Sequence, residues 1–361
     1  MAAPLLLLSD DEALTSAVGR LAAAAGVDLV VDPGHGGVPS SWSSAAAVLV
    51  GADVAARTAV SPPSRRDLVH VVCPGPAPDP LFRLAVALGA SSVVELPDGE
   101  AWLAGVLADL GDEPHGPGTV LAVVPGSGGA GATTFAAALA LAAAAPAAGR
   151  PGPVALVDLD PLGPGLAGLL GRDGGSGEPG PVVTWPELGG SRGRLGAREL
   201  RTALRARDGV GVLGWGRRGA PRTLPSPTVL HEVVSALRRG HAWVVLDVPR
   251  HAVGELGPVL GCDAGVVVAR PAWPALASAT EVVSALAPLV GRVHVVVRGD
   301  DVAADQVARI LGVPGTTVLR HHRRLDEHLD LGLGPVHGRR NPVATAADEV
   351  LRALGSRRAG R

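Results

Sequence analysis

The chain lacks two residue types altogether. It has 361 residues and contains no lysine and no tyrosine, so all 32 of its basic side chains are arginines. Aromatic residues amount to only 2%, and much of the 47% apolar content is alanine. We attribute the arginine bias to a GC-rich genome rather than to arginine chemistry. The absence of lysine nevertheless excludes every site that needs a lysine ammonium group, including an ordinary lysine-containing phosphate loop.

Charge and cysteine are also scarce. The formal net charge is −2 and no block of like charges occurs, so strong nucleic-acid binding gains no support. Cys73 and Cys262 lie far apart and form no metal or redox motif, and we expect both to be buried in a reducing cytoplasm. The N-terminus has no signal-peptide pattern, and the most apolar run, residues 135–148, is too short to span a bilayer and contains Pro146. We therefore expect a cytoplasmic protein.

Residues 1–110 alternate between strand-like and helix-like patterns, and we interpret them as a first domain. Short apolar runs predict five strands, at 4–9, 27–32, 45–51, 68–74 and 91–97. Helical patterns such as 11–26 and 80–89 separate several of them. This alternation predicts a doubly wound parallel sheet between two layers of helices.

A second series begins after residues 111–118, which we interpret as a linker because they combine proline, glycine and charge without an apolar period. Residues 119–361 form the second predicted domain, again a doubly wound three-layer α/β fold. The predicted strands are 119–126, 153–160, 210–216, 242–249, 264–271, 292–299 and 316–321. The glycine-rich segment 172–192 contains no obvious element, and such long loops are usually functional or mobile.

The stretch PGSGGAGATTF, residues 125–135, has the glycine spacing of a phosphate loop. Gly126 and Gly131 hold the two glycine positions, but Ala132 stands in the place of the lysine. Glycines at a strand-to-helix turn let backbone N–H groups point at a phosphate, and the helix dipole favours the anion. A tight turn without a ligand is an equally strong interpretation of the glycines alone. The candidate phosphate-binding residues are Ser127, Gly128, Gly129, Ala130, Gly131, Ala132, Thr133 and Thr134.

Two later segments favour the phosphate loop over a simple turn. VALVDLD at 154–160 and WVVLDVP at 243–249 place carboxylates at the ends of apolar strands, where ligands of open α/β sheets bind. With the loop, they resemble the MinD/ParA family of deviant P-loop ATPases, whose loop KGGxGKT is followed by an aspartate pair and an Asp-x-Pro segment. The resemblance covers about 119–361. It implies a MinD/ParA-like P-loop NTPase fold.

The resemblance also implies roles for individual residues. Asp160 corresponds to the water-positioning, catalytic aspartate, and Thr133 and Asp247 correspond to the magnesium site, which Asp247 can contact through water. The alternative for the aspartates is capping of a helix or loop. The departures are Ser127 and Ala132 at the two family lysines and Val297 at the adenine-reading asparagine. We therefore expect weak binding of ATP and Mg²⁺ and little hydrolysis, unless an arginine replaces the lysines. The candidate arginines are Arg172, Arg192, Arg194, Arg198, Arg201, Arg205 and Arg207, for most of which a solvated helix face is the simpler interpretation.

Residues 185–218 resemble most closely the actinobacterial CpaE-like proteins, also called septum site-determining proteins. Trp185 and Trp215 of this stretch are expected to be core or loop anchors, with a partner-binding surface as the alternative. The first domain resembles the response-regulator receivers that CpaE proteins carry.

The likeness to receivers is incomplete. Asp10 and Asp11 resemble the acidic pair that binds magnesium in receivers, and the alternative for them is an N-cap of the first helix. Gly51 stands near the phospho-acceptor position, Asp53 follows two residues late, and Leu96 replaces the lysine. The implied module is a pseudo-receiver that binds proteins without being phosphorylated.

Three functions compete at this point. The first is a nucleotide-responsive switch that regulates septum placement or the assembly of a pilus or secretion system. The second is a nucleotide-independent pseudo-ATPase scaffold with protein partners of the same machinery, and the third is a ParA-like DNA-associated partitioning protein. A homodimer is expected only if contacts other than the family lysine hold it. Residues 343–361 carry a short apolar stripe, which predicts a last helix packed on the sheet and membrane recruitment only through partners.

Overall fold

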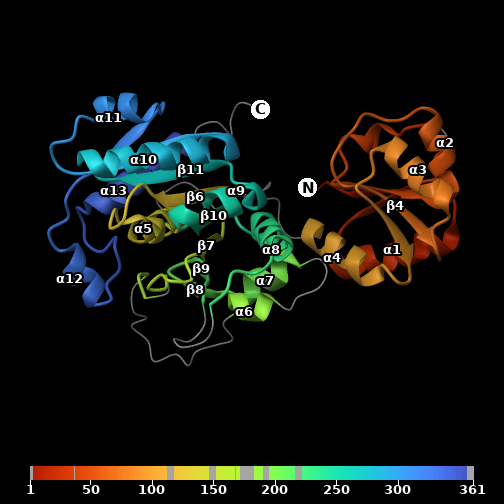
Figure 1. Ribbon diagram of the computed structural model, residues 1–361. Helices are drawn as coiled ribbons and strands as arrows, with labels where there is room; N and C mark the ends of the chain where they lie inside the picture. The colour runs from red at the N-terminus through yellow and green to blue at the C-terminus, as the bar shows by residue number, and fades with distance from the viewer. Residues whose placement is uncertain are drawn as a thin grey trace. The chain divides into compact units, whose positions relative to one another are not determined.

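The computed structural model divides into two compact units, residues 1–114 and 115–361, each with a sheet of its own. Figure 1 shows a sheet flanked by helices in both units. The described residues are 3–35, 37–111, 118–145, 152–166, 168–170, 183–189, 195–215 and 222–355.

The first unit contains a five-stranded parallel sheet with the strand order β2-β1-β3-β4-β5. All five strands lie where the apolar runs predict them. They are β1 Leu5–Leu8, β2 Leu29–Asp32, β3 Ala47–Gly51, β4 Val69–Pro74 and β5 Ser92–Leu96. Because β1 and β3 are buried on both faces, they consist of unbroken apolar residues.

Four helices cover this sheet, two on each face. They are α1 Glu12–Ala25, α2 Ala52–Val60, α3 Asp79–Leu88 and α4 Glu100–Gly111. α1 and α4 share one apolar core, and α2 and α3 share the other. Asp11 begins α1 as its N-cap, with Oδ1 accepting the N–H groups of Ala13 and Leu14. The capping interpretation of Asp11 is therefore confirmed.

The second unit contains an eight-stranded sheet with the order β13-β12-β11-β6-β10-β7-β9-β8. Seven strands are parallel and follow the sequence prediction. They are β6 Thr119–Pro125, β7 Val154–Asp158, β9 Val210–Leu213, β10 Trp243–Asp247, β11 Ala264–Ala269, β12 Val293–Arg298 and β13 Thr316–Leu319. Their carboxyl ends therefore lie along one edge of the sheet, and β6, which leads into the glycine loop, lies near the middle.

The helices of this unit are α5 Ala132–Ala144, α6 Trp185–Leu188, α7 Ala197–Ala203, α8 Pro227–Gly240, α9 Val253–Leu260, α10 Trp273–Leu286, α11 Ala304–Leu311, α12 Leu325–Asp330 and α13 Pro342–Gly355. α5 and α13 cover one face, and α7 to α11 cover the other. α13 buries Val343, Ala347 and Val350 against the sheet, which confirms the predicted packing of the last helix. Among the described residues, none of the helices combines the length and the apolar character that crossing a bilayer requires.

Two local predictions were wrong. The sequence suggests no element within 172–192, yet the described part of this segment contains α6, which a capping box between Thr184 and Glu187 begins. The edge strand β8 Arg205–Arg207, antiparallel to β9, was not predicted because three residues are too few for a periodicity. Several predicted segments lie outside the described residues. These are 172–182 and 190–192 of the glycine-rich segment, 112–117 of the linker and the tail 356–361.

Trp185 and Trp215 lie in the core, with 1% and 8% of their surfaces exposed. Their ring centroids are 6.4 Å apart, and Nε1 of Trp185 donates a 2.6 Å hydrogen bond to the carbonyl of Asp158. The anchor interpretation is therefore confirmed, and the alternative of a partner-binding surface is wrong for both rings. Trp185 ties α6 to the end of β7, next to the candidate site. Cys73 and Cys262 are buried free thiols, as expected.

Candidate functional site

The glycine loop connects β6 to α5 in a conformation that only glycine adopts easily. Gly129 has φ +70° and Gly131, the N-cap of α5, has φ +91°. Gly131 offers no side-chain cap, so the first N–H groups of α5, at Ala132, Thr133 and Thr134, have no intrahelical acceptor. A helix of 13 residues thus presents free donors and the positive end of its dipole at this turn.

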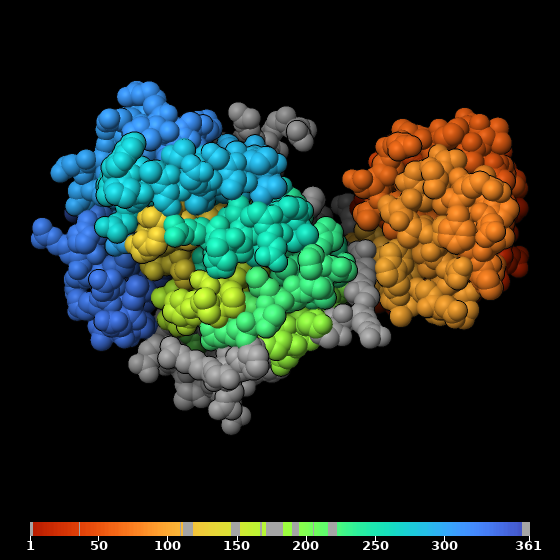
Figure 2. Space-filling model, viewed as in Figure 1, coloured from red at the N-terminus to blue at the C-terminus, as the bar shows by residue number. Residues whose placement is uncertain are grey.

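The loop residues differ in their exposure. Gly128 and Gly129 are exposed, whereas Ala130 and Ala132 are 1% and 3% exposed. In Figure 2 the segment of β6 and α5 reaches the surface as a small yellow patch bordered by later elements. The Ser127 Oγ is buried and, within the described residues, has no hydrogen-bond partner. The loop is therefore accessible at Gly128 and Gly129, whereas Ala132, at the position of the family lysine, is buried.

The strand ends bring two predicted carboxylates together. Asp247 and Asp158 are register partners at the ends of β10 and β7. Asp247 also accepts a hydrogen bond from the hydroxyl of Thr133, the second residue of α5. The structure thus brings together the threonine and the aspartate that the resemblance pairs as a magnesium site.

Burial raises the pKa of both carboxyl groups. Asp247 is 3% exposed, and its desolvation raises its pKa to about 7, while the Thr133 hydrogen bond lowers it and the charges of Asp158 and Asp160 raise it further. Asp158 is 2% exposed, and desolvation raises its pKa to about 6. The hydrogen bond that it accepts from the N–H of Asp160 opposes this shift, because it favours the charged form. A cation at this point would relieve the repulsion between these carboxylates.

Asp160 lies in the turn that follows β7. Its Oδ1 accepts the N–H of Leu162 at 3.0 Å, so here it caps a turn, as the alternative interpretation has it. The second carboxylate oxygen makes no bond among the described residues. Arg222 lies against the same turn, where its Nη1 donates to the carbonyl of Gly163 at 3.1 Å.

Arg298 is a cation that the sequence patterns did not reveal. It ends β12, and a β-carbon built on Gly131 would lie 3.3 Å from its Nη1. The guanidinium group therefore lies against the turn of the glycine loop. Among the described residues, Arg298 makes no ion pair and no side-chain hydrogen bond. The only signal in the sequence is its position directly after Val297, which stands at the family's asparagine.

The arginines of 172–207, which the sequence offers as replacements for the lysines, are only partly described. Arg172, Arg192 and Arg194 lie outside the described residues. Arg201 donates to the carbonyl of Gly240, away from the loop. Arg222, beyond that segment, is occupied by the turn after β7.

The residues present fit a magnesium ion only as part of a larger complex. Within the described chain, no three His, Cys, Asp or Glu side chains converge on a point that could hold a metal. Thr133 and Asp247 offer two oxygens, and Mg²⁺ commonly takes the rest of its shell from phosphates and water. The donor set therefore suits Mg²⁺ bound with a nucleotide and not Mg²⁺ alone.

In the first unit, Asp53 is held beside Ser9 and Asp10. Its carboxylate accepts hydrogen bonds from the Ser9 hydroxyl at 3.1 Å and the Asp10 N–H at 2.7 Å. A β-carbon on Gly51 would overlap Oδ1 of Asp53, so this carboxylate occupies the space beside the position where receivers carry their acceptor. Asp10 contacts His35 at 3.3 Å.

Comparison with known proteins gives matches for both units. Residues 8–118 match a family model described as the Rv3660c-like, CheY-like N-terminal domain. The protein Rv3660c of Mycobacterium tuberculosis H37Rv, itself called uncharacterized, is 36% identical over 365 residues, which cover 97% of this chain and 99% of that protein.

Solved structures resemble the chain in fold. A ParA family ATPase of Chlorobium tepidum TLS aligns with a TM-score of 0.53 and 14% identity, over 64% of this chain and 97% of that one. The septum site-determining protein MinD of Pyrococcus horikoshii OT3, complexed with Mg-ADP, aligns with a TM-score of 0.50 and 19% identity, over 67% and 97%. The predicted fold class, a receiver-like domain followed by a MinD/ParA-like P-loop domain, is confirmed.

Proposed function

Because this chain belongs to the family of the mycobacterial protein Rv3660c, we propose that it is a regulator of the MinD/ParA type that binds ATP weakly through a lysine-free phosphate loop. The observation that carries the proposal is the uncapped N-terminus of α5. The guanidinium group of Arg298 lies against Gly131 at this N-terminus. Backbone donors and one guanidinium group then replace the lysine.

The magnitude of the replacement sets the expected affinity. Each lysine on a phosphate contributes about 2–3 kcal/mol as a charge-assisted contact. The chain lacks two such contacts, at Ser127 and Ala132, and Arg298 can restore one. Binding weaker than that of a lysine-containing loop follows, together with slow hydrolysis, because phosphoryl transfer depends on positioning and charge neutralisation.

The remaining site residues take the roles that the resemblance implies. Thr133 and Asp247 hold Mg²⁺ together with the nucleotide, and the ion supplies neutralisation of phosphate charge. Asp160 positions water through its uncommitted oxygen, with Asp158 as a buried neighbour. Ser127, Gly128, Gly129, Ala130, Gly131, Ala132 and Thr134 surround the phosphates.

The process in which the protein acts is septum placement or the assembly of a pilus or secretion system, as in the CpaE-like proteins. Its partners are proteins of that machinery, and the receiver-like unit, without phosphorylation, is one of the surfaces that contact them. A homodimer, where it forms, does not use the family lysine, because Ser127 stands in its place. Membrane association takes place through partners. The proposed domain limits are 1–110 and 119–361, with 111–118 as the linker.

A deletion and complementation experiment in the native host tests the role. We expect the deletion to shift septum positions or to abolish pilus or secretion assembly, and the intact gene to restore the normal state. A Thr133→Ala gene should fail to restore it if nucleotide drives the function. Thr280→Ala is the matched control, because this threonine bonds only within α10. A deletion with no effect on any of these processes contradicts the proposal.

A nucleotide-independent scaffold is the second candidate, and one observation favours it. Ser127 and Ala132 stand at the two positions where the family loop carries lysines, so the loop lacks two charges that would hold the phosphates of a nucleotide. On this alternative, Thr133→Ala restores the function as well as the intact gene does. The complementation experiment therefore separates the two candidates.

A further inference from the structure

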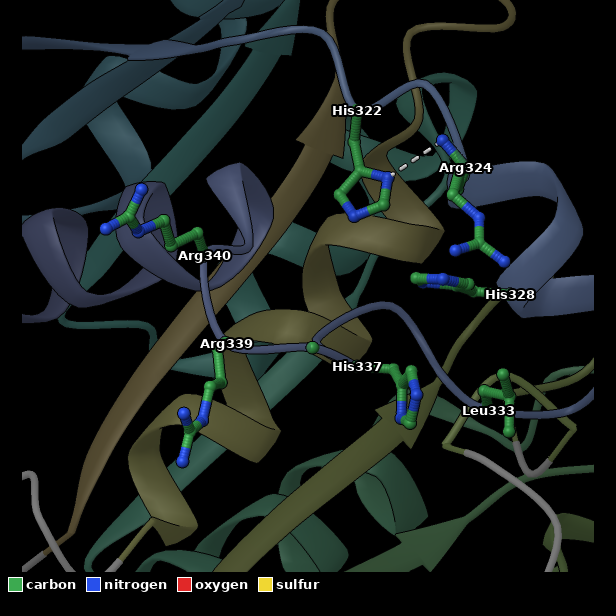
Figure 3. A pocket seen from close by; sticks show the side chains of 8 residues that line it. His322, Arg324, His328, Leu333, His337, Arg339 and Arg340 are labelled. Atoms are coloured by element: carbon green, nitrogen blue, oxygen red, sulfur yellow. Dashed lines mark hydrogen bonds between the residues drawn. The ribbon is translucent and has the colours of Figure 1, made fainter.

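A cavity of about 330 Å³ is lined by the segment that joins β13 to α13 and includes α12, and none of its lining residues was assigned above. Its lining is rich in nitrogen donors and contains no carboxylate. The lining residues are His322, Arg324, His328, Leu333, His337, Gly338, Arg339 and Arg340. Figure 3 shows His322, His328 and His337 around one hollow, with the guanidinium of Arg324 beside His328.

The three imidazole rings are packed edge to face. The centroids of His322 and His328 are 5.1 Å apart, and those of His328 and His337 are also 5.1 Å apart. His328 is 7% exposed, and its buried Nδ1 has no hydrogen-bond partner among the described residues. A buried polar atom without a partner is costly, so it points to a ligand or water in this cluster.

One proton position follows from the hydrogen bonds. The backbone N–H of Arg324 donates to Nδ1 of His322 at 3.2 Å, so this nitrogen carries no proton. The neutral ring must therefore be protonated at Nε2, which makes Nε2 a donor. In Figure 3 that nitrogen faces the hollow.

The loop that carries half of this lining is held in place. Asn341, which is 4% exposed, donates through Nδ2 to the carbonyls of Pro335 and His337 at 2.9 and 3.0 Å. Its Oδ1 caps α13 by accepting the N–H of Val343. His337 and the two arginines after it are thus presented by a braced loop, which lowers the cost of ordering them around a ligand.

The field in the pocket is positive. Burial, followed by the charges of His322, His337 and Arg324, lowers the pKa of His328, and Glu327 alone opposes this effect. Glu327 is paired with Arg324 at 2.7 and 2.9 Å, whereas Arg339 and Arg340 have no carboxylate partner within the described chain. The same side chains that disfavour a proton on His328, namely His322, His337 and Arg324, favour the binding of an anion.

We propose that this His–Arg pocket binds the phosphate group of a small anion, independently of the glycine loop. Guanidinium and imidazole N–H donors match phosphate oxygens, and no acidic lining residue opposes them. Within the described residues no three ligating side chains converge on a point that could hold a metal, so the lining favours an anion. The phosphate comes either from a free phosphate anion or from a nucleotide.

Imidazole NMR of the full chain, labelled in histidine, tests the proposal with pyrophosphate and ATP as separate probes. We expect saturable shifts of the pocket imidazoles, assigned through the His322→Gln variant, at constant ionic strength. Shifts with pyrophosphate assign free phosphate anions to the pocket, and shifts with ATP alone assign a nucleotide. Arg339→Ser should weaken binding about tenfold, while Arg323→Ser, an exposed neighbour outside the lining, should leave it unchanged.

Two results overturn the proposal. One is the absence of any shift beyond that of sodium chloride at equal ionic strength. The other is an equal loss of binding in Arg339→Ser and Arg323→Ser, which indicates general screening and no site. The Thr133→Ala protein should keep the response to pyrophosphate. The experiment therefore distinguishes a failure of the proposed nucleotide site at the glycine loop from a failure of the proposed His–Arg pocket.

Discussion

At the scale of the residue, the proposed nucleotide site depends on Arg298. We predict that Arg298→Ala weakens the binding of Mg-ATP by about 10- to 100-fold, because one charge-assisted phosphate contact is lost. Arg298→Lys should retain much of the affinity, since the charge persists. Titration calorimetry measures both, with Arg309→Ala on the exposed side of α11 as the control. Equal affinity in Arg298→Ala and the parent chain would exclude Arg298 from the site.

The sequence could predict most of the site but not this arginine. The glycine loop, Asp158 and Asp247 are found by motif, because each follows directly from a strand end that local patterns reveal. Arg298 meets the loop only because the sheet places β12 two strands from β6. Such a contact is long-range, and no local pattern carries it. The arginines of 172–207 were predicted as candidates to replace the lysines because they cluster in the sequence.

Asp247 gives a prediction about pH. Its pKa rises from the ordinary value of 3.8 to about 7 in the folded chain, so the folded state binds more protons than the unfolded state between these values. Stability of the parent chain should therefore fall as pH rises through this window. Asp247→Asn removes the buried charge and keeps an acceptor for Thr133. It should stabilise the chain by at most about 4 kcal/mol at about pH 8, and by much less at about pH 5.

Thermal unfolding at the two pH values checks this expectation. The exposed Asp326, which takes part in no hydrogen bond of the site, provides the control in Asp326→Asn. If Asp247→Asn stabilises the chain equally at both pH values, the buried charge of Asp247 does not destabilise the parent chain, and the prediction is wrong.

At the scale of the element, Trp185 fastens α6 to the end of β7. It is 1% exposed and bonds the carbonyl of Asp158, so Trp185→Ala leaves a cavity and an unpaired acceptor. We predict a loss of about 3–5 kcal/mol in the free energy of unfolding. Urea unfolding followed by circular dichroism measures it. Trp273, 74% exposed at the start of α10, is the matched control, and Trp273→Ala should cost little. A small effect at Trp185 would contradict the packing described.

Element prediction from the sequence succeeded where burial is complete. β1, β6, β7 and β10 are unbroken apolar runs that end at a turn or a carboxylate, and their limits agree within a few residues. α6 was missed because its four residues show no helical period and its capping box lies inside a glycine-rich stretch. β8 was missed for the same reason, since its three residues owe their conformation to pairing with β9.

At the scale of the whole molecule, each unit has its own core on both faces of its own sheet. We therefore predict that residues 1–110 and 119–361, produced separately, each unfold in one cooperative transition. Circular dichroism during heating measures this for both. If either piece is unfolded alone, the proposed domain limits are wrong.

The measurement that tests the central claim most directly is a calorimetric titration of the full chain with ATP and magnesium. We predict saturable but weak binding, which Thr133→Ala reduces and Thr280→Ala leaves unchanged. Absence of heat at millimolar ATP, from protein shown by circular dichroism to be folded, would contradict it. The loop of residues 125–135 would then have kept the shape of a phosphate site without its function, and the scaffold would be the function of the chain.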